Sequence, residues 1–346
     1  MANLGKQIVK QAFISKKRAD VLLDTIQKDI RRLNKKISKL AFQAYDLLID
    51  RLDMDVSTIV NSMDNLEKLS LWMPSFDMLL NRYRVEYKNT FENHRVNLFV
   101  HLKDKELRLM KVLAKMGVKD DRVTITNESL DMMNAINSNM YTNIENMLIK
   151  WRGYIYDAFF QGITQSLPVD KLRELFVNTT GTLRIGSSLE EISETEAAMA
   201  AVAQKTAYNR GQARKNGYDY CWNANPMDPR TKAICMQASL AGVIPEGEML
   251  NAYGFPPRFI CRCEIVYTRS EWTELNQAIN GELRDIRERL IDELIEAPRQ
   301  LTQWYVAGKL VTASDPARAA GDKMYADIEE KLEIARSTEV PDFEVR

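Results

Sequence analysis

The chain has 346 residues, enough for two or three domains, and its 45% apolar and 28% charged residues are ordinary for a globular protein. Lysine plus arginine equals aspartate plus glutamate at 48 each, so the overall charge indicates no polyanionic partner. We expect no secretory signal, because the first residues lack an apolar core, and no membrane span, because the longest apolar run, 197–203, is too short.

With only 14 glycines and 10 prolines, the chain favours long helices over strands and turns. Apolar residues at alternating spacings of three and four predict a helix that includes residues 23–47. This helix either self-associates as a coiled coil or packs in an antiparallel hairpin within one chain. The hairpin is favoured, because apolar stripes usually mark an ordinary core face. The repeat comprises Leu23, Ile26, Ile30, Leu33, Ile37, Leu40, Ala44 and Leu47.

Basic residues accumulate at the N-terminus, where residues 1–40 hold eleven lysines and arginines against three aspartates. These side chains either contact DNA phosphates, in a manner that salt weakens, or form a solvated helix face. The solvated face is favoured, because no aromatic residues are interleaved to stack on bases. The candidate DNA contacts are Arg31, Arg32, Lys35, Lys36 and Lys39.

The middle of the chain also has helical periodicity. Residues 54–115 are expected to be helical, with a break at Pro74, which lacks a backbone donor. A boundary is predicted at 116–127. Helices are then expected over 129–165, 166–178 and 189–216, and the last of these is rich in alanine, so we place it against a partner helix. Asn216-Gly217 predicts a left-handed cap at its end.

Residues 218–267 carry all four cysteines, together with strand-like runs. The runs 218–222 and 260–267 are expected to pair as antiparallel strands. Between them, Asp228 and Pro229 predict the start of a helix that runs to Leu240, followed by a loop. A small core is expected from Trp222, Ile234, Phe255, Ile260 and Ile265, supported by the helices on either side.

The C-terminal part is expected to contain a helix over 270–296, which Pro298 closes, and a second helix over 315–336. Between them, residues 304–312 read as a strand or turn. Residues 337–346 are expected to be a frayed end.

The ordered features of residues 190–270 are similar to those of the phage Mu F-like (minor capsid, head morphogenesis) family. In chain order, they are Thr206-Ala207-Tyr208-Asn209-Arg210, Gly217, the aromatic strand, Asp228-Pro229-Arg230-Thr231, Cys235, Gly242, Pro256-Pro257 and Cys261-Arg262-Cys263. The resemblance covers about a quarter of the chain, and its specificity lies in the ordered combination, because no single motif is specific.

The resemblance implies a component of the virion or prohead, made in the host cytoplasm and acting near the portal in head morphogenesis. Its partners would be the portal protein and other head proteins, and some members of the family accompany the genome. The chain departs from the family at Lys232, where a cysteine is common, and at 258–260, where His-Pro often precedes the Cys-x-Cys. Both departures weaken a metal site carried over from the family.

Four thiolates, from Cys221, Cys235, Cys261 and Cys263, would suit a closed tetrahedral zinc site. Their sequence spacings match no standard zinc ribbon or finger, however, and four cysteines in so long a chain fit a reducing compartment. We therefore favour buried free thiols and expect no cofactor. A disulfide between Cys235 and either Cys261 or Cys263 stays open once a virion leaves the cell.

No enzyme is predicted. A nucleophilic cysteine needs an adjacent base, and the only histidines, His94 and His101, lie more than a hundred residues upstream of the cysteines. Their spacing of seven residues is also unusual for a metal-binding pair, so we interpret them as core or surface residues. Asp228 and Arg230 are explained as a helix cap and a salt bridge, and Arg230 and Arg262 would brace the segment against acids such as Glu264.

The sequence therefore predicts a mostly α protein in which a long helical region precedes a compact α+β domain with a short antiparallel sheet. Residues 1–165 would form a helical, coiled-coil-like assembly region, 166–296 a head morphogenesis module and 297–346 a C-terminal extension. The predicted function is that of a minor head protein, with a nucleic-acid-binding protein as the alternative. The predicted site residues are Asp228, Arg230, Thr231, Cys235, Pro256, Pro257, Cys261, Arg262 and Cys263.

Overall fold

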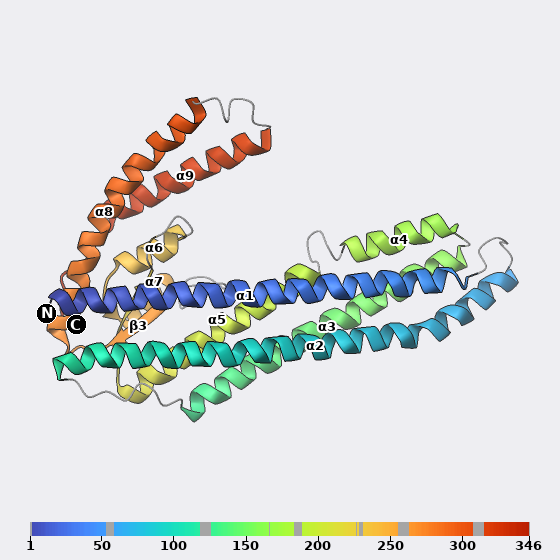
Figure 1. Cartoon of the computed structure of the whole chain (residues 1–346), viewed down its shortest axis with the longest axis horizontal. Coiled ribbons are helices and arrows are strands. Elements are labelled where there is room, and N and C mark those ends of the chain that lie inside the picture. The colour runs from blue at the N-terminus through green and yellow to red at the C-terminus, as the bar shows by residue number, and fades with distance from the viewer. Residues whose placement is uncertain are drawn as a thin grey trace. The chain divides into compact units, whose positions relative to one another are not determined.

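The fold is predominantly helical and contains one three-stranded antiparallel sheet, which confirms the predicted fold class (Figure 1). The structure is a computed structural model. It describes residues 2–52, 59–117, 126–165, 167–182, 189–225, 227, 231–254, 263–306 and 315–345.

The chain divides into two compact units. The sheet unit comprises Met1–Asp20, Val100–Leu130 and Lys205–Arg346, and the helical unit comprises Val21–Phe99 and Asp131–Gln204. Each unit thus combines segments that are distant in sequence, whereas the predicted domains are consecutive stretches that end at residues 165 and 296. The domain division stays a prediction.

Helices α1 (Ala2–Ile49) and α2 (Ile59–Leu113) contribute residues to both units. Within the helical unit they run antiparallel (Figure 1). Nε1 of Trp72 donates a hydrogen bond to the carbonyl of Ala44 at 2.8 Å, and the hydroxyl of Tyr83 donates to Oδ1 of Asn34 at 2.8 Å. The favoured hairpin within one chain is therefore the arrangement found, and self-association stays a prediction.

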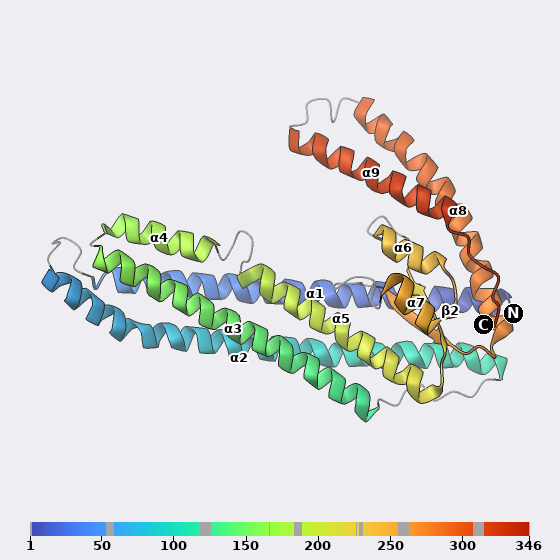
Figure 2. The same cartoon turned by 180° about the vertical axis from the view of Figure 1, so that it is seen from behind.

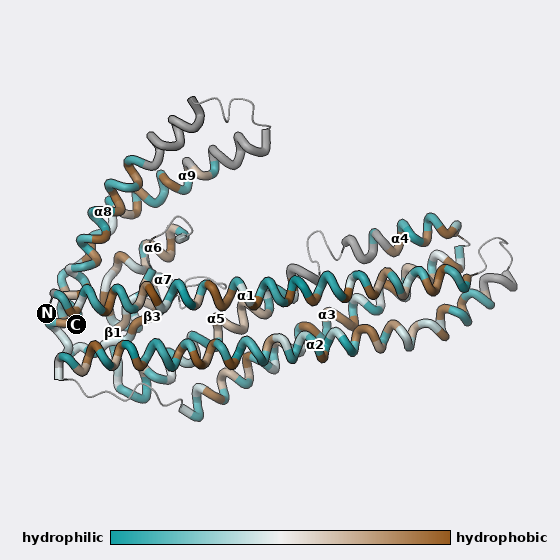
Figure 3. The backbone as a smooth tube through the Cα atoms, in the orientation of Figure 1, coloured by the Kyte–Doolittle hydropathy of each residue, from teal (hydrophilic) through white to brown (hydrophobic). Residues whose placement is uncertain are grey.

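Apolar and hydrophilic residues alternate along both helices (Figure 3). The predicted stripe on α1 is buried from Leu23 to Ile37, but Leu47 is 59% exposed, so the predicted end of the repeat is wrong. A straight helix has 3.6 residues per turn and drifts away from a repeat of 3.5. The buried positions accordingly shift to Ala41, Tyr45 and Leu48.

Helix α2 continues through Pro74, so the predicted break is wrong. Pro74 has no backbone N–H to donate to the carbonyl of Ser70. Both residues are exposed, so water can hydrate that carbonyl. The residues around the proline are anchored by burial, since Trp72 is 4% and Phe76 0% exposed. Their packing offsets the proline penalty of about 3 kcal/mol.

Three further helices, α3 (Asn127–Thr164), α4 (Val169–Thr182) and α5 (Leu189–Asn216), follow the predicted segments closely. In the helical unit, α4 lies beside α1 and α3 (Figure 2). Its Phe176 contacts aromatic residues of both helices. The ring of Phe176 stacks on Tyr45 with centroids 4.4 Å apart and lies 5.8 Å from the ring of Phe159.

The first half of α5 packs against α1 and α2, as its alanine content predicts. Ala197 and Ala198 are fully buried, and Ser193 accepts hydrogen bonds from Asn34 and Tyr87. The helix ends as predicted at Gly217, whose φ of 64° is left-handed.

The sheet consists of β1 (Tyr220–Ala224), β2 (Ile244–Pro245) and β3 (Glu264–Thr268) in the order β2-β1-β3. Both neighbours are antiparallel to β1, and Ala224 lies opposite Glu264. The predicted pairing of the two main strands is confirmed, with β1 starting two residues later than predicted. The two-residue strand β2 was not predicted, because so short a run carries no periodic signal.

Helix α6 (Ala233–Leu240) is capped by Lys232, whose backbone is extended and whose side chain makes no capping hydrogen bond. The predicted cap at Asp228 is therefore wrong, and Asp228 and Pro229 lie outside the described residues. Helix α7 (Glu246–Tyr253) occupies part of the predicted loop. Its eight residues include Gly247, a poor helix former, so no helical pattern was visible.

Helices α8 (Thr273–Val306) and α9 (Asp315–Ser337) form the C-terminal part. The predicted end of α8 at Pro298 is wrong, since the helix runs on to Val306. Residues 304–306 are consequently helical, and the rest of the predicted strand or turn at 304–312 lies outside the described residues.

The predicted frayed end is also wrong, because residues 338–345 pack onto the sheet unit. The backbone N–H of Phe343 donates to Oε1 of Gln277 at 2.6 Å, and its ring lies edge-on to Tyr220 at 5.2 Å. Val340 and Phe343 are 6% and 7% exposed. The available sequence signal was the apolar residues Val340, Phe343 and Val345 in an otherwise mostly polar tail.

The core of the sheet unit joins α1, α2, α5, the sheet and α8 in one cluster. Trp222 is 0% and Ile265 5% exposed, as predicted, and Trp272 of the flanking segment belongs to the same cluster. Ile234 is 39% exposed, so its predicted core position is wrong: α6 turns its other face inward. Phe255 and Ile260 lie outside the described residues.

Phe343→Ala is expected to destabilise the protein by about 3 kcal/mol, because it removes a buried aromatic ring and leaves a cavity beside Tyr220. Val345→Ala is the matched control, since Val345 is 60% exposed and its truncation should change stability by less than about 0.5 kcal/mol. Urea unfolding measures both. Equal stability of the two variants would mean that the tail does not contribute to the core.

Candidate functional site

A buried charge cluster ties two helices to the sheet. Glu264, the first residue of β3, places its Oε1 2.8 Å from Nζ of Lys105 on α2. Its Oε2 lies 3.8 Å from Nζ of Lys205 on α5. All three side chains are at most 5% exposed. We call Lys105, Lys205 and Glu264 the buried charge cluster.

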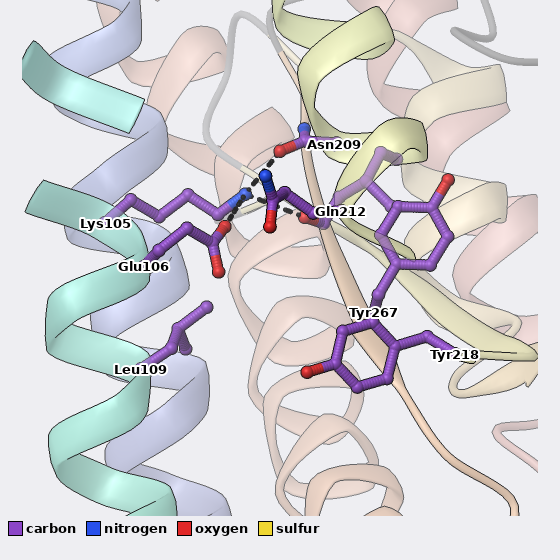
Figure 4. A pocket seen from close by; sticks show the side chains of 8 residues that line it. Lys105, Glu106, Leu109, Asn209, Gln212, Tyr218 and Tyr267 are labelled. Atoms are coloured by element: carbon purple, nitrogen blue, oxygen red, sulfur yellow. Dashed lines mark hydrogen bonds and ion pairs between the residues drawn. The ribbon is translucent and has the colours of Figure 1, made fainter. Parts of the chain in front are cut away.

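Further hydrogen bonds satisfy the two ammonium groups. Lys105 donates to Oδ1 of Asn209 at 2.9 Å and to the carbonyl of Ile265 at 3.2 Å, and Glu106 lies 3.3 Å away (Figure 4). Lys205 donates to the carbonyl of Cys263 at 2.5 Å. The cluster thus holds the backbone at the start of β3 as well as the carboxylate.

Burial alone would raise the pKa of Glu264, but the charges of Lys105 and Lys205 lower it to about 2. Burial likewise acts to lower the pKa of Lys105, and the attraction of Glu264 and Glu106 outweighs it, so this pKa is raised. Both groups therefore stay charged at neutral pH.

His101 lies one turn before Lys105 on α2, with its Nε2 3.4 Å from the hydroxyl of Ser15. Burial lowers the pKa of His101 to about 4, with Glu264 acting in the opposite direction. The imidazole is consequently neutral at pH 7 and adds no third cation beside the two lysines. The buried position of His101 agrees with its interpretation as a core residue.

A cavity of about 10 Å³ adjoins the cluster (Figure 4). This volume is close to the minimum for one water molecule, so the cavity cannot take a substrate. The cluster therefore acts as a structural connection rather than as a binding pocket. The cavity is lined by Lys105, Glu106, Leu109, Asn209, Gln212, Tyr218, Ile265 and Tyr267.

A larger groove of about 360 Å³ lies between the first turns of α1 and the middle of α8, within the size range of ligand sites. Its apolar floor includes Phe13 and Ile286. Its rim carries both signs of charge, from Lys6, Lys10, Glu282, Arg289 and Glu293. This mixture selects neither an anionic nor a cationic ligand.

Cys235 and Cys263 pack against each other, apart from the main core, and each is 5% exposed. Neither is in a disulfide. Cys235 is the third residue of α6, and Cys263 immediately precedes β3. The predicted proximity of Cys235 to the Cys-x-Cys motif is thus confirmed for Cys263, while Cys261 lies outside the described residues.

Asn225, which follows β1, organises the turn beside this pair. Its Nδ2 donates to Sγ of Cys263 at 3.2 Å. Its Oδ1 accepts the hydroxyl of Thr231 at 2.7 Å and the backbone N–H of Met227 at 3.0 Å. These bonds hold Met227 at a φ of 57°, which is uncommon for a residue with a side chain.

Cys221 does not join the pair. It is fully buried in the main core, opposite Tyr267 in the β1–β3 register, and burial raises its pKa. Within the described part of the chain, no three metal-ligating side chains come together. The arrangement of Cys221, Cys235 and Cys263 therefore does not match the four-thiolate zinc site considered from the sequence.

Of the predicted site residues, the structure brings Thr231, Cys235 and Cys263 into one neighbourhood through Asn225. The others, which are Asp228, Arg230, Pro256, Pro257, Cys261 and Arg262, lie outside the described residues. The predicted bracing of Glu264 by an arginine is consequently untested.

The predicted DNA contacts lie on α1 in the helical unit, and three of them are ion-paired within the chain. Arg31 contacts Glu194 at 2.8 Å, and Arg32 contacts Asp29 at 3.0 Å. Lys36 contacts Glu86 at 2.8 Å. Lys35 and Lys39 are exposed.

Sequence reasoning missed Lys105 and Lys205 as partners of Glu264, and Asn209 as an acceptor for Lys105. A weak signal existed in Lys205, which stands in a run of alanines and other small residues, and in Glu264, which interrupts a strand-like apolar run. Lys105 stands in a charged stretch of α2, however, where nothing distinguishes a buried lysine from an exposed one.

None of the described helices has a segment long and apolar enough to cross a membrane. Comparison with known proteins found no matching family model, no matching curated protein and no matching solved structure.

Glu264→Gln is expected to destabilise the protein by about 3–5 kcal/mol, because it removes the counter-charge of the buried Lys205 and leaves the buried Lys105 with Glu106 alone. Glu271→Gln is the control, since the Glu271–Arg269 pair is exposed and contributes less than about 1 kcal/mol. The triple variant Lys105→Met, Lys205→Met, Glu264→Leu should be less destabilised than Glu264→Gln. Urea unfolding that ranks Glu264→Gln with its control would refute the structural role of the cluster.

The free energy of unfolding is expected to fall between pH 6.5 and 4.5. The folded pKa of His101 is about 4, below its ordinary 6.5, so His101 stabilises the fold above pH 6.5. This contribution of up to about 3 kcal/mol is lost as the pH falls toward 4, because the unfolded chain binds the proton first. Urea titrations at several pH values should show a flatter profile for His101→Gln, and an unchanged profile would disprove the assignment.

Proposed function

We propose that this protein is a minor head protein of a bacteriophage that acts in head assembly near the portal. It would be made in the host cytoplasm and be present in the virion. The observation that carries the proposal is the buried charge cluster. It connects Glu264 and Lys205, both inside the segment that resembles the phage Mu F-like family, to Lys105 on the long helix α2.

The connection between module and helix supports a mechanical role. One apolar core contains residues of the sheet together with Ile8 and Val9 of α1 and Leu109 and Val112 of α2. The two helices have 48 and 55 residues, or about 70 and 80 Å at 1.5 Å per residue. In an assembly protein, this core would hold the folded module on the first turns of α1 and the last turns of α2.

An exposed apolar row on α2 supports binding to other proteins. It consists, in the helical unit, of Leu71, Met78, Val85 and Val96, each at least 50% exposed. Their spacings of 7, 7 and 11 residues place them on one face of a helix. We call them the α2 row. Exposed apolar residues that are aligned in this way are typical of protein interaction surfaces, and the portal and other head proteins are the proposed partners.

The proposal is a binding function and not a catalytic one. Of the two histidines, His101 contacts Ser15 and His94 contacts Asp29 at 3.1 Å, and the thiols of Cys221, Cys235 and Cys263 are buried. This geometry favours structural roles for all five side chains.

Nucleic-acid binding through α1 is the alternative. Ion pairs within the chain already partly neutralise Arg31, Arg32 and Lys36, which reduces the number of phosphates that this face could neutralise. Lys35 and Lys39 are the exposed candidates left for that role. Because three of the five candidate contacts are ion-paired within the chain, we favour the assembly function.

The α2 row provides the test. Leu71→Glu with Met78→Glu is expected to reduce incorporation into proheads at least about tenfold, because charges on an apolar contact oppose its burial. Lys35→Glu with Lys39→Glu, also exposed on a helix, is the matched control and should be incorporated normally. Mass spectrometry of purified proheads and virions measures incorporation, after circular dichroism has confirmed that both variants fold.

Absence of the unaltered protein from proheads and virions would overturn the proposed function. The alternative makes the opposite prediction for the control pair: Lys35→Glu with Lys39→Glu would abolish DNA binding that weakens steeply with added salt. Fluorescence anisotropy with duplex DNA separates the two functions.

A further inference from the structure

We propose that Cys235 and Cys263 are an oxidation site, at which a low-molecular-weight disulfide such as oxidised glutathione closes a disulfide bond across the sheet unit. The inference is independent of the proposed function. It starts from the contact between two cysteines, both 5% exposed and neither in a disulfide, that form a cluster of their own.

Strand β1 holds both thiols in place. On the α6 side, Nδ2 of Asn223 donates to the carbonyl of Cys235 at 3.2 Å, and Nε1 of Trp222 donates to the carbonyl of Ser239 at 3.1 Å. On the β3 side, the ladder fixes Ala224 opposite Glu264, the residue after Cys263. Both cysteines are thereby fixed to one strand, in contact with each other.

The surroundings of the two sulfur atoms differ. Cys263 accepts a hydrogen bond on Sγ from Nδ2 of Asn225 at 3.2 Å, and its carbonyl accepts the ammonium of Lys205. A donor aimed at sulfur favours the thiolate over the thiol, and the thiolate is the nucleophile in exchange. The geometry therefore assigns the first attack to Cys263 and makes Asn225 its positioning residue.

The reaction balances as two exchanges. The Cys263 thiolate attacks one sulfur of oxidised glutathione, which forms a mixed disulfide and releases one glutathione thiolate. Cys235, on losing its proton, attacks the Cys263 sulfur of that mixed disulfide, which forms the Cys235–Cys263 bond and releases the second glutathione. Two electrons pass from the cysteine pair to glutathione, and the two thiol protons end on the two released glutathione molecules.

The bond would tie α6 to the start of β3 and enclose residues 236–262, which contain β2 and α7. Closing a loop of this length restricts the unfolded chain. The oxidised protein should therefore unfold roughly 5–10 °C higher than the reduced protein, and dithiothreitol should reverse the shift.

Peptide mapping of the full-length protein after oxidation tests the pairing. Trypsin cleaves after Arg262, so Cys261 and Cys263 fall on different peptides, and Cys235 lies on a third, 233–258. The expected product, mapped under non-reducing conditions, links the Cys235 and Cys263 peptides. A link from Cys235 to Cys261, or mixed glutathione disulfides alone, would overturn the proposal.

Single serine variants provide the controls. Cys235→Ser and Cys263→Ser should each abolish the linked peptide, whereas Cys221→Ser should leave it unchanged, because Cys221 lies in the main core. Asn225→Ala should slow closure several-fold when closure is followed by quenching with acid. If these variants do not fold, the map of the unaltered protein still decides between Cys263 and Cys261. Closure at the same rate in Asn225→Ala would refute the positioning role.

Discussion

The requirement that a buried carboxylate be neutralised constrains the sheet unit more than any other interaction described above. Glu264 is fully buried, and an unpaired carboxylate in such a place would cost far more than the net stability of a domain provides. Lys105 and Lys205 must therefore both reach it, which fixes α2 and α5 relative to the first residue of β3. These charges add a specific connection to the apolar core that already joins the sheet to the helices.

Burial of both faces of the sheet explains why β1 and β3 show no alternation of apolar and polar residues. All five residues of β1 and all five of β3 are buried, and both faces are covered by other elements. Polar residues inside such strands need partners: Asn223 finds the carbonyl of Cys235, and Glu264 finds the two lysines. Residues 190–270 thus contain polar groups whose partners lie both inside and far outside this segment.

Local patterns predicted the elements well, and long-range partners poorly. The bounds of α5 were predictable because Gly217 adopts a left-handed φ and ends the helix with local chemistry. The pairing of β1 with β3 followed from their composition. Lys105, in contrast, is 159 residues from Glu264, and no local pattern distinguishes it from its exposed neighbours. The burial of Phe343 likewise depends on Tyr220 and Gln277, which a reading of the tail alone cannot include.

In the helical unit, buried polar contacts fix the register of the long helices. Apolar stripes on long helices tolerate sliding by a turn, because one aliphatic side chain replaces another at small cost. A buried hydrogen-bond network does not, since sliding would leave its donors and acceptors unpaired. Asn34 on α1 donates to Ser193 on α5 and accepts from Tyr83 on α2, while Tyr87 on α2 donates to the carbonyl of Ser193. This network selects one register for the three helices, as a buried asparagine does in coiled coils. A single register also fixes the α2 row relative to the rest of the helical unit, which a surface that binds a partner specifically requires.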